Sequence, residues 1–259
     1  MRLTTIIALT ALTLLLAATL VFALRPALLT STLIALGLAP APPPRSNELT
    51  IEERLALIDP AATLRIKPYF DAAKVPYPPA AVTLVGLKAD KLLQLYARGP
   101  APDDAWRLIH TYPVRAASGH LGPKLKEGDR QVPEGVYGVD YLNPNSKFSV
   151  SMRVTYPNDF DRAMAAKDKR DKDTLGNAIM IHGRASSIGC LAMGDPASEE
   201  LFVLAHAVGL ENMTVILAPV DFRKAPRPTL DQPPVWIDDL YTQIDEALKP
   251  LPLPSGTAS

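Results

Sequence analysis

The longest apolar stretch of the chain lies at its start, where residues 3–24 contain no charged side chain. Arg2 and Arg25 flank the stretch, one on each side, so the charges give no orientation. Because a helix of about 20 apolar residues spans a bilayer, the stretch predicts an N-terminal hydrophobic helix. Two interpretations stay open: an uncleaved membrane anchor, or a signal peptide that is removed after the small residues Val21 and Ala23.

Proline separates this stretch from the rest of the chain. Residues 26–44 are uncharged and end in Pro-Ala-Pro-Pro-Pro, which is typical of a stiff polyproline spacer. We therefore expect four parts: a transmembrane anchor or signal segment over residues 1–25, a Pro-rich linker over 26–49, one globular domain over 50–250 and a flexible tail over 251–259. The globular part is long enough to bury one hydrophobic core.

Within the globular part, segments with period-two alternation or short apolar runs predict strands, and segments with helical spacing predict helices. The predicted strands cover residues 81–87, 107–114, 135–141, 147–156, 178–181 and 214–218. The predicted helices cover residues 51–58, 88–97, 195–208 and 236–248. Thr50 and Glu53 form a capping-box pattern for the first helix, and Pro60 is expected to end it. The order of strands and turns favours an antiparallel meander in a mainly-β domain with flanking α-helices.

Charge and cysteine content narrow the classes of function. Lys plus Arg and Asp plus Glu both number 27, so the formal net charge is zero. Nucleic-acid-binding proteins normally carry a basic excess, and we expect no nucleic-acid partner. The single Cys excludes an internal disulfide framework and a zinc site made of several thiolates. With only four His as further ligands, we expect no metal site.

The strongest candidate for chemistry is the segment from His182 to Cys190. A predicted strand ends in His182, and a loop of small residues leads to Cys190 eight positions later. Such a loop can fold back so that imidazole and thiol meet, and a neighbouring His is the usual activator of a nucleophilic Cys. Arg184 is placed to keep a thiolate ionised or to bind a substrate carboxylate. A lone Cys or His is more often structural, so the pattern alone leaves both roles open.

Three adjoining motifs give the segment a family resemblance. IMIHG over residues 179–183, SIGC over 187–190 and LAMGD over 191–195 resemble the L,D-transpeptidase catalytic domain (YkuD-like) family, whose members act on peptidoglycan stem peptides. The match is closest to the YafK-like branch of murein L,D-transpeptidases. Further similar stretches cover residues 118–137, 142–148, 156–162 and 200–223, so the resemblance spans roughly residues 50–250. It implies the mainly-β sandwich or barrel of that family.

The resemblance also implies a mechanism and a set of site residues. Cys190 would attack a stem-peptide carbonyl after a diaminopimelate-type residue and form a thioester, with His182 as base and no cofactor. The amides of Gly189 and Cys190 would hold the oxyanion, and the carbonyl of Gly183 would orient the imidazole. One departure is Ile188, where most family members carry a second His, so the groove around Cys190 must differ. Candidate substrate-binding residues are Arg184, Ser187, Tyr156, Asn158 and Arg162, and a turn-stabilising role for Asn158 is the alternative.

Three functions fit this resemblance. An amine acceptor gives a transpeptidase that forms cross-links or attaches a protein to the wall. Water as acceptor gives a hydrolase that cleaves peptidoglycan peptides or protein–peptidoglycan links with the same residues. A catalytically silent wall-binding module is the third alternative. In each case we expect a periplasmic domain, anchored in the inner membrane by the N-terminal segment or secreted after cleavage.

Overall fold

Residues 48–254 are described by a computed structural model. The predicted N-terminal helix and residues 26–47 of the predicted linker lie outside the described residues. Within residues 48–254, no helix combines the length and the apolar character needed to cross a bilayer.

The larger sheet has five strands, ordered β3-β2-β1-β9-β4. At its centre, β1 (Ala81–Leu87) runs antiparallel to β2 (Leu92–Arg98) and parallel to β9 (Met213–Ala218). β3 (Arg107–Pro113) extends the sheet beyond β2, and β4 (Gly135–Tyr137) pairs antiparallel with β9. The sheet is therefore mixed, and segments far apart in the sequence form its middle.

The smaller sheet has four strands, ordered β5-β6-β7-β8. β5 (Val139–Asn143), β6 (Ser151–Val154) and β7 (Met180–His182) are antiparallel neighbours. β8 (Leu191–Ala192) then pairs parallel to β7. This last pair joins the two ends of the loop that holds the candidate nucleophile.

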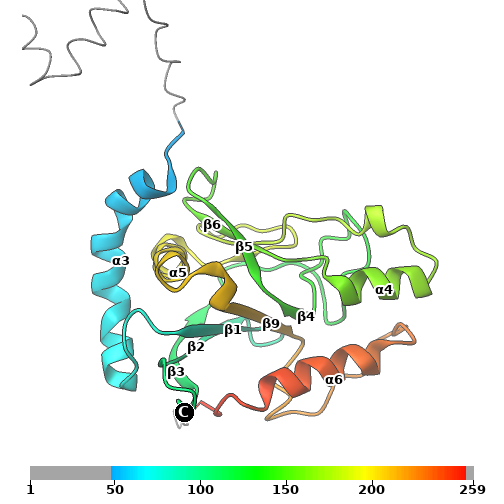
Figure 1. The fold of residues 1–259 in the computed structure, drawn as a ribbon. Coiled ribbons are helices and arrows are strands. Elements are labelled where there is room, and N and C mark those ends of the chain that lie inside the picture. Colours follow the sequence, from blue (N-terminus) through cyan, green and yellow to red (C-terminus); the bar gives the residue numbers. More distant parts are fainter. Residues whose placement is uncertain (1–47, 255–259) are drawn as a thin grey trace, which may run out of the picture. The chain divides into compact units, whose positions relative to one another are not determined.

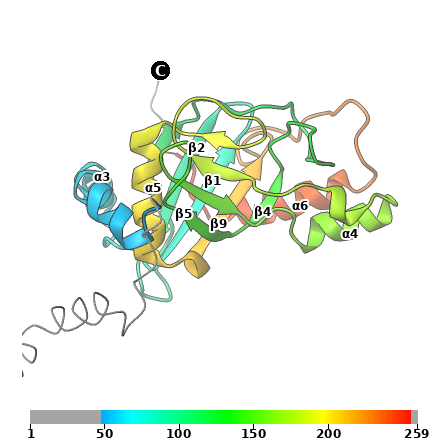
Figure 2. The same cartoon turned by 90° about the horizontal axis from the view of Figure 1, so that it is seen from above.

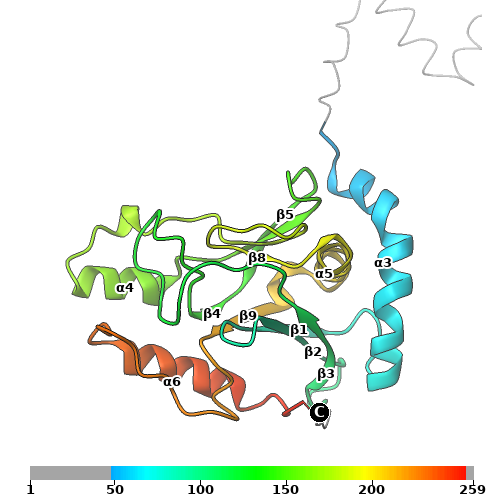
Figure 3. The same cartoon turned by 180° about the vertical axis from the view of Figure 1, so that it is seen from behind.

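Within the part of the chain that the structure describes, four helices surround the sheets. α3 (Ile51–Ala73) and α5 (Asp195–Val208) lie side by side at one end of the domain (Figures 1 and 2). α4 (Asp159–Lys167) lies at the other end, and α6 (Ile237–Leu248) runs along the larger sheet on the side away from β5 and α5 (Figures 1 and 3). Two short 3-10 turns cover Lys172–Thr174 and Leu210–Asn212.

Strand β1 shows how the core is divided. Val82 and Leu84 belong to a hydrophobic cluster shared with the smaller sheet, α3 and α5. Val85 and Leu87 point the other way, into a cluster with α6. Because side chains alternate along a strand, a strand covered on both faces becomes buried throughout, and every residue of β1 after Ala81 is buried.

Several predictions differ from the structure: the predicted strand over 135–141 is two strands in different sheets, β4 and β5, and the predicted strand over 147–156 is shortened to β6. The predicted helix over 88–97 is wrong, because this segment contains a turn followed by β2, which pairs with β1 along its whole length. Leu93 and Leu95 face one core cluster and Tyr96 faces the other, so apolar residues with helical spacing serve both faces of a strand. The antiparallel meander is also wrong, because the β1–β9 and β7–β8 pairs are parallel.

The first helix has the predicted capping box but not the predicted end. Thr50 and Glu53 cap each other's backbone as expected. The helix passes through Pro60 and Pro68 and ends at Ala73, although proline removes a helix donor. The buried face of the helix continues past both prolines, so tertiary packing outweighs the two missing hydrogen bonds. The residues of this face are Leu55, Ile58, Ala62, Ile66 and Phe70.

The predicted architecture is confirmed in part: residues 48–254 form mixed sheets with flanking helices, but more residues lie in helices than in strands, so the domain is not mainly β. The strands at 81–87, 107–114 and 214–218 are confirmed. The packed domain extends slightly past its predicted boundary at residue 250. Leu251 is buried in the α6 cluster, and the carbonyl of Pro252 accepts a hydrogen bond from the Tyr96 hydroxyl at 3.1 Å. Leu251 and Pro252 therefore pack against the domain, and residues 255–259 of the expected tail lie outside the described residues.

Candidate active site

The parallel pair β7–β8 brings the predicted nucleophile and base to one cavity. His182 is the last residue of β7, and Cys190 directly precedes β8. Ile181 pairs with Leu191, so Cys190 falls opposite Met180, two positions before His182. The side chains of His182 and Cys190 line the same cavity, which has a volume of about 420 Å³. We call it the thiol cavity.

The backbone fixes the protonation of the His182 ring. Nδ1 lies 2.7 Å from the carbonyl oxygen of Gly183, and a carbonyl can only accept a hydrogen bond. Nδ1 therefore carries the hydrogen in the neutral ring, which leaves Nε2 with a free lone pair. Burial lowers the pKa of His182, and the Gly183 carbonyl offsets part of this shift. The resting imidazole is thus neutral and able to accept a proton.

Gly183 is glycine for a steric reason. A Cβ atom at this position would lie 2.5 Å from Oδ1 of Asp195, 2.5 Å from the Phe148 carbonyl oxygen and 2.9 Å from Oγ of Ser198. The Asp195 carboxylate also accepts the backbone N–H of Arg184 at 2.7 Å. The carbonyl that orients the imidazole is therefore held by packing on several sides. This packing cannot be inferred from the sequence, because the contacts come from separate segments.

The Cys190 thiol lies against the edge of β7. The backbone N–H of Met180 donates to Sγ at 3.4 Å, and Sγ lies 3.7 Å from the carbonyl oxygen of Ala178. Burial raises the pKa of the Cys190 thiol, while the Met180 N–H and the positive charge of Lys124 offset only part of this rise. The thiol is therefore protonated at neutral pH and needs a base before it can attack.

The two amides expected to hold an oxyanion already have partners. The N–H of Gly189 donates to Oγ of Ser118 at 2.7 Å, and the N–H of Cys190 donates to Oγ of Ser187 at 2.9 Å. The Ser187 hydroxyl in turn donates to the Cys190 carbonyl at 2.7 Å. Gly189 has φ +92°, in the left-handed region where glycine is favoured. A substrate oxygen would have to replace these serine hydroxyls.

Ser118 was not expected from the sequence, and it belongs to a tightly bonded loop. Its hydroxyl donates to the Arg130 carbonyl at 2.7 Å while accepting from Gly189. Lys88 anchors the same loop from the core sheet, with Nζ 2.8 Å from the Gly122 carbonyl and 3.0 Å from the buried Glu134 carboxylate. No local pattern could have revealed a partner 71 positions away from Gly189.

Two apolar side chains complete the mouth of the thiol cavity. The ring of Phe148 lies over the ring of His182, with centroids 4.6 Å apart and planes tilted by 34°. Ile188 is 74% exposed and lines the same cavity, at the position where the resemblance implies a second His in most family members. The entrance near the nucleophile is therefore apolar.

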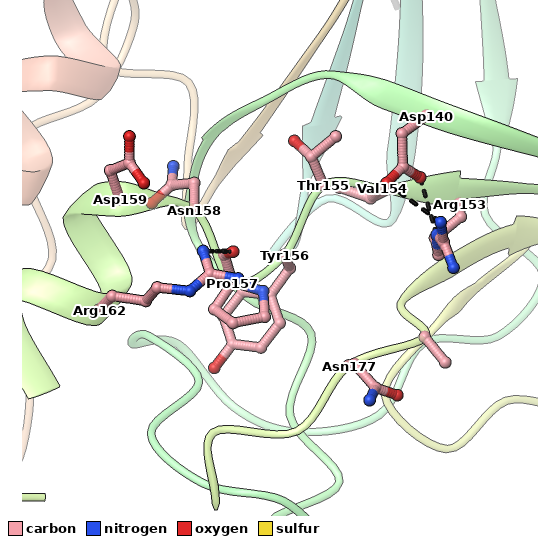
Figure 4. Close-up of a pocket in the computed structure, with 11 residues that line it drawn as sticks. Asp140, Arg153, Val154, Thr155, Tyr156, Pro157, Asn158, Asp159, Arg162 and Asn177 are labelled. Atoms are coloured by element: carbon pink, nitrogen blue, oxygen red, sulfur yellow. Dashed lines mark hydrogen bonds and ion pairs between the residues drawn. The ribbon is translucent and has the colours of Figure 1, made fainter. Parts of the chain in front are cut away.

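The remaining predicted substrate residues fall into two places. Ser187 lines the thiol cavity, whereas Arg184 is exposed and is not among the residues that line it. Tyr156, Asn158 and Arg162 line a neighbouring cavity of about 510 Å³ (Figure 4). The structure thus brings some of the predicted residues together beside the thiol cavity rather than in it.

Two of these three residues also have structural partners. The side-chain oxygen of Asn158 accepts from the Asp161 N–H at 2.9 Å as the N-cap of α4, and its amide nitrogen donates to the Val136 carbonyl at 2.9 Å. The Tyr156 hydroxyl lies 3.2 Å from the Leu175 carbonyl, and burial raises the pKa of this phenol. Arg162 alone among the three presents a formal charge to the cavity.

Comparison with known proteins gives three kinds of match. The chain is 34% identical over 117 residues to the Escherichia coli (strain K12) protein named Putative L,D-transpeptidase YafK. The alignment covers 44% of this chain and 43% of YafK, so the chain spans less than half of this curated relative. Solved structures with partial likeness include the helical cell shape determining protein Pgp2 of Campylobacter jejuni (24% identity, TM-score 0.42, 54% of this chain and 48% of Pgp2).

Two further structures show weaker likeness. Bd1075 of Bdellovibrio bacteriovorus has 13% identity and a TM-score of 0.40 over 67% of this chain and 56% of Bd1075. L,D-transpeptidase 1 of Mycobacterium tuberculosis has 15% identity and a TM-score of 0.30 over 53% of this chain and 62% of the other. Likeness at this level assigns neither fold nor activity.

The model of the YkuD family, the L,D-transpeptidase catalytic domain, matches residues 82–216, from β1 to β9 and just over half of the chain. The chain therefore belongs to the L,D-transpeptidase catalytic domain family.

Proposed function

We propose that this protein is a cell-wall cysteine L,D-transpeptidase that forms a thioester with a peptidoglycan stem peptide and transfers it to an amine. The observation that carries the proposal is the thiol cavity, which is lined by both Cys190 and a neutral imidazole with a free Nε2. Family membership supports a wall peptide as the substrate. The match to YafK covers less than half of that protein, so the activity of the present chain is proposed from its own site and family.

The first chemical step follows from the protonation states. Cys190 rests as a thiol, so Nε2 of His182 takes its proton as sulfur attacks the peptide carbonyl. A C–S bond forms, and the carbonyl oxygen becomes an oxyanion. The C–N bond then breaks, and the imidazolium returns the proton to the leaving amine. The product is a thioester on Cys190 and a free amine.

The second step reverses the roles. A neutral acceptor amine attacks the thioester carbonyl, His182 removes a proton from the amine, and the C–S bond breaks to restore the thiol. With water in place of the amine, the same sequence gives hydrolysis.

Oxyanion stabilisation involves the amides of Gly189 and Cys190. Both amides lie next to the nucleophile and now donate to the hydroxyls of Ser118 and Ser187. In the proposed reaction, the substrate oxygen replaces one or both hydroxyls as acceptor. An amide aimed at a developing oxyanion typically contributes a factor of about 100 or more in rate.

The cellular setting is part of the proposal. We place the catalytic domain, residues 50–250, on the periplasmic side, where peptidoglycan stem peptides and wall-attached proteins are available as partners. Residues 1–25 would deliver it there as an inner-membrane anchor or a cleaved signal, with 26–49 as linker. Carbonate washing of membranes separates the two: an anchored protein stays in the membrane fraction, and a cleaved one does not.

The reaction is tested with peptidoglycan and tetrapeptide muropeptides, analysed by mass spectrometry. The full chain is compared with the Cys190→Ala variant. New cross-linked or exchanged species that require Cys190 support transpeptidation. Loss of mass by Cys190-dependent hydrolysis indicates the hydrolase instead. Equal product patterns for the two proteins would rule out Cys190 catalysis on these substrates.

A further inference from the structure

Beside the thiol cavity lies a second hollow of about 510 Å³, which we call the Arg162 cavity (Figure 4). The polar and charged residues that line it are Asp140, Arg153, Asn158, Asp159, Arg162 and Asn177. This lining contrasts with the apolar mouth of the thiol cavity. A substrate lying across both hollows would therefore meet two different chemical surroundings.

The two hollows share a wall that touches the nucleophile. Ala178 lines both cavities, and its carbonyl oxygen lies 3.7 Å from Sγ of Cys190. Ala178 also has φ +55°, an uncommon conformation for a residue with a side chain, and such residues concentrate at functional sites. Ala178 is thus the residue that separates a ligand in the Arg162 cavity from Sγ of Cys190.

The charges in the cavity are unequally paired. Arg153 donates two hydrogen bonds to the Asp140 carboxylate, at 2.7 and 3.2 Å, so the charges of these two residues neutralise each other (Figure 4). Arg162 is exposed and forms no ion pair with a carboxylate within the described residues; its guanidinium donates to the Pro157 carbonyl, and its positive charge lowers the pKa of the nearby Asp161 carboxyl, partly offsetting the rise caused by burial. The carboxylate of Asp161 accepts the Asn158 N–H at 2.9 Å in the cap of α4 instead.

A planar guanidinium without a carboxylate partner is the side chain best suited to bind a carboxylate. Asp159 is exposed at the same cavity and adds a negative charge. The cavity therefore suits a ligand that carries both a carboxylate and an amine, and it disfavours a ligand with an excess of negative charge.

We propose that the Arg162 cavity binds the acceptor of the transfer reaction, an amine with a neighbouring carboxylate, through that carboxylate. The proposal rests on the cysteine acyl-transfer function above. The bound acceptor, as the neutral amine, attacks the thioester carbonyl on Cys190; the C–N bond forms, the C–S bond breaks, and His182 passes the amine proton to the leaving sulfur.

The test measures how the acyl-enzyme divides between amine and water. The full chain is acylated with a tetrapeptide muropeptide in the presence of diaminopimelate or its diamide, which lacks both carboxylates. Mass spectrometry gives the ratio of aminolysis to hydrolysis product. The amide is the less basic amine and is less protonated at neutral pH, so without carboxylate recognition it reacts faster. A preference for diaminopimelate therefore reports recognition.

The expected result is that wild type prefers diaminopimelate and that Arg162→Gln lowers its aminolysis ratio by about tenfold, the scale of one charge-assisted hydrogen bond. Arg162→Lys should restore part of the preference. The matched control Arg107→Gln changes an exposed arginine at the start of β3 that lines neither cavity, and it should behave as wild type.

Two outcomes overturn the inference. If wild type uses the diamide as well as the diacid, or if Arg162→Gln keeps the preference, the cavity does not bind the acceptor carboxylate. Acyl-enzyme formation is measured in the same samples by intact mass. A normal acyl-enzyme with no carboxylate preference rejects only the acceptor site, whereas no acyl-enzyme in any variant rejects the proposed function and the inference with it.

Discussion

Replacing Gly183 by alanine tests how the imidazole of His182, the proposed base, is supported. The added Cβ would meet three oxygen atoms, from Asp195, Phe148 and Ser198, at 2.5, 2.5 and 2.9 Å. Two of these contacts are far below an ordinary van der Waals distance, so the backbone or its neighbours must shift. Overpacking of this kind costs about 1–3 kcal/mol, which corresponds to a fall in Tm of roughly 2–12 °C for a domain of this size.

The shift should affect activity more than stability. The Gly183 carbonyl holds Nδ1 of His182 at 2.7 Å, so moving this carbonyl turns or frees the imidazole. A displacement on the order of 1 Å in a catalytic group can lower the rate by about 100-fold. We therefore expect Gly183→Ala to lower kcat by about two orders of magnitude while most of the protein stays folded at 25 °C.

Thermal unfolding and steady-state kinetics with a tetrapeptide muropeptide measure the two effects. Gly138→Ala is the matched control, because a Cβ there would meet its nearest atoms at 3.7–3.8 Å, an ordinary contact. The control should keep its activity and gain up to about 1 kcal/mol of stability from reduced freedom of the unfolded chain. Wild-type kcat and Tm in Gly183→Ala would refute the steric argument.

Four further predictions concern neighbouring groups. Ser118→Ala removes the hydroxyl that the substrate oxygen has to replace on the Gly189 amide, so kcat should rise about 2–10-fold with little change in KM, while Ser118→Thr keeps the hydroxyl and the wild-type rate in the same kinetic assay. Lys88→Met leaves the Glu134 carboxylate buried without its ion pair and should cost about 3–5 kcal/mol in urea unfolding. Burial lowers the pKa of His182, so the acid limb of the pH–rate profile should lie below the usual histidine range. Burial raises the pKa of the Cys190 thiol, so alkylation by iodoacetamide should begin to accelerate at a higher pH in the folded protein than in the urea-unfolded protein. Wild-type kinetics or stability in the Ser118 and Lys88 variants would contradict the role of those two contacts. Ordinary pKa values for His182 and Cys190 would contradict the effect of burial on these groups.

Local signals in the sequence accounted for several elements of the fold. The capping box at Thr50, the strand over 81–87 and the end of α5 at Gly209 each depend on residues close together in the chain. The placement of His182 at a strand end, followed by a small-residue loop to Cys190, is local for the same reason. The structure places both residues at one cavity.

Features that depend on distant segments could not be predicted. The segment over 88–97 has helical spacing, but pairing with β1 on one side and β3 on the other makes its second half a strand. Ser118 accepts a hydrogen bond from Gly189, in the loop before Cys190, and Lys88 donates one to Gly122, in the loop that contains Ser118. Both hydrogen bonds join segments that are far apart in the sequence. The division of the substrate residues between two cavities likewise depends on how β6, α4 and β7 are arranged.

The central claim is that Cys190 carries the acyl group. Intact-mass analysis of the protein, quenched seconds after mixing with a tetrapeptide muropeptide, measures this directly. The account predicts an adduct equal to the donor without its leaving residue, released by hydroxylamine as a thioester and absent from Cys190→Ala. An adduct that persists in Cys190→Ala, or peptidoglycan turnover by wild type with no adduct at Cys190 under any quench time, would contradict it.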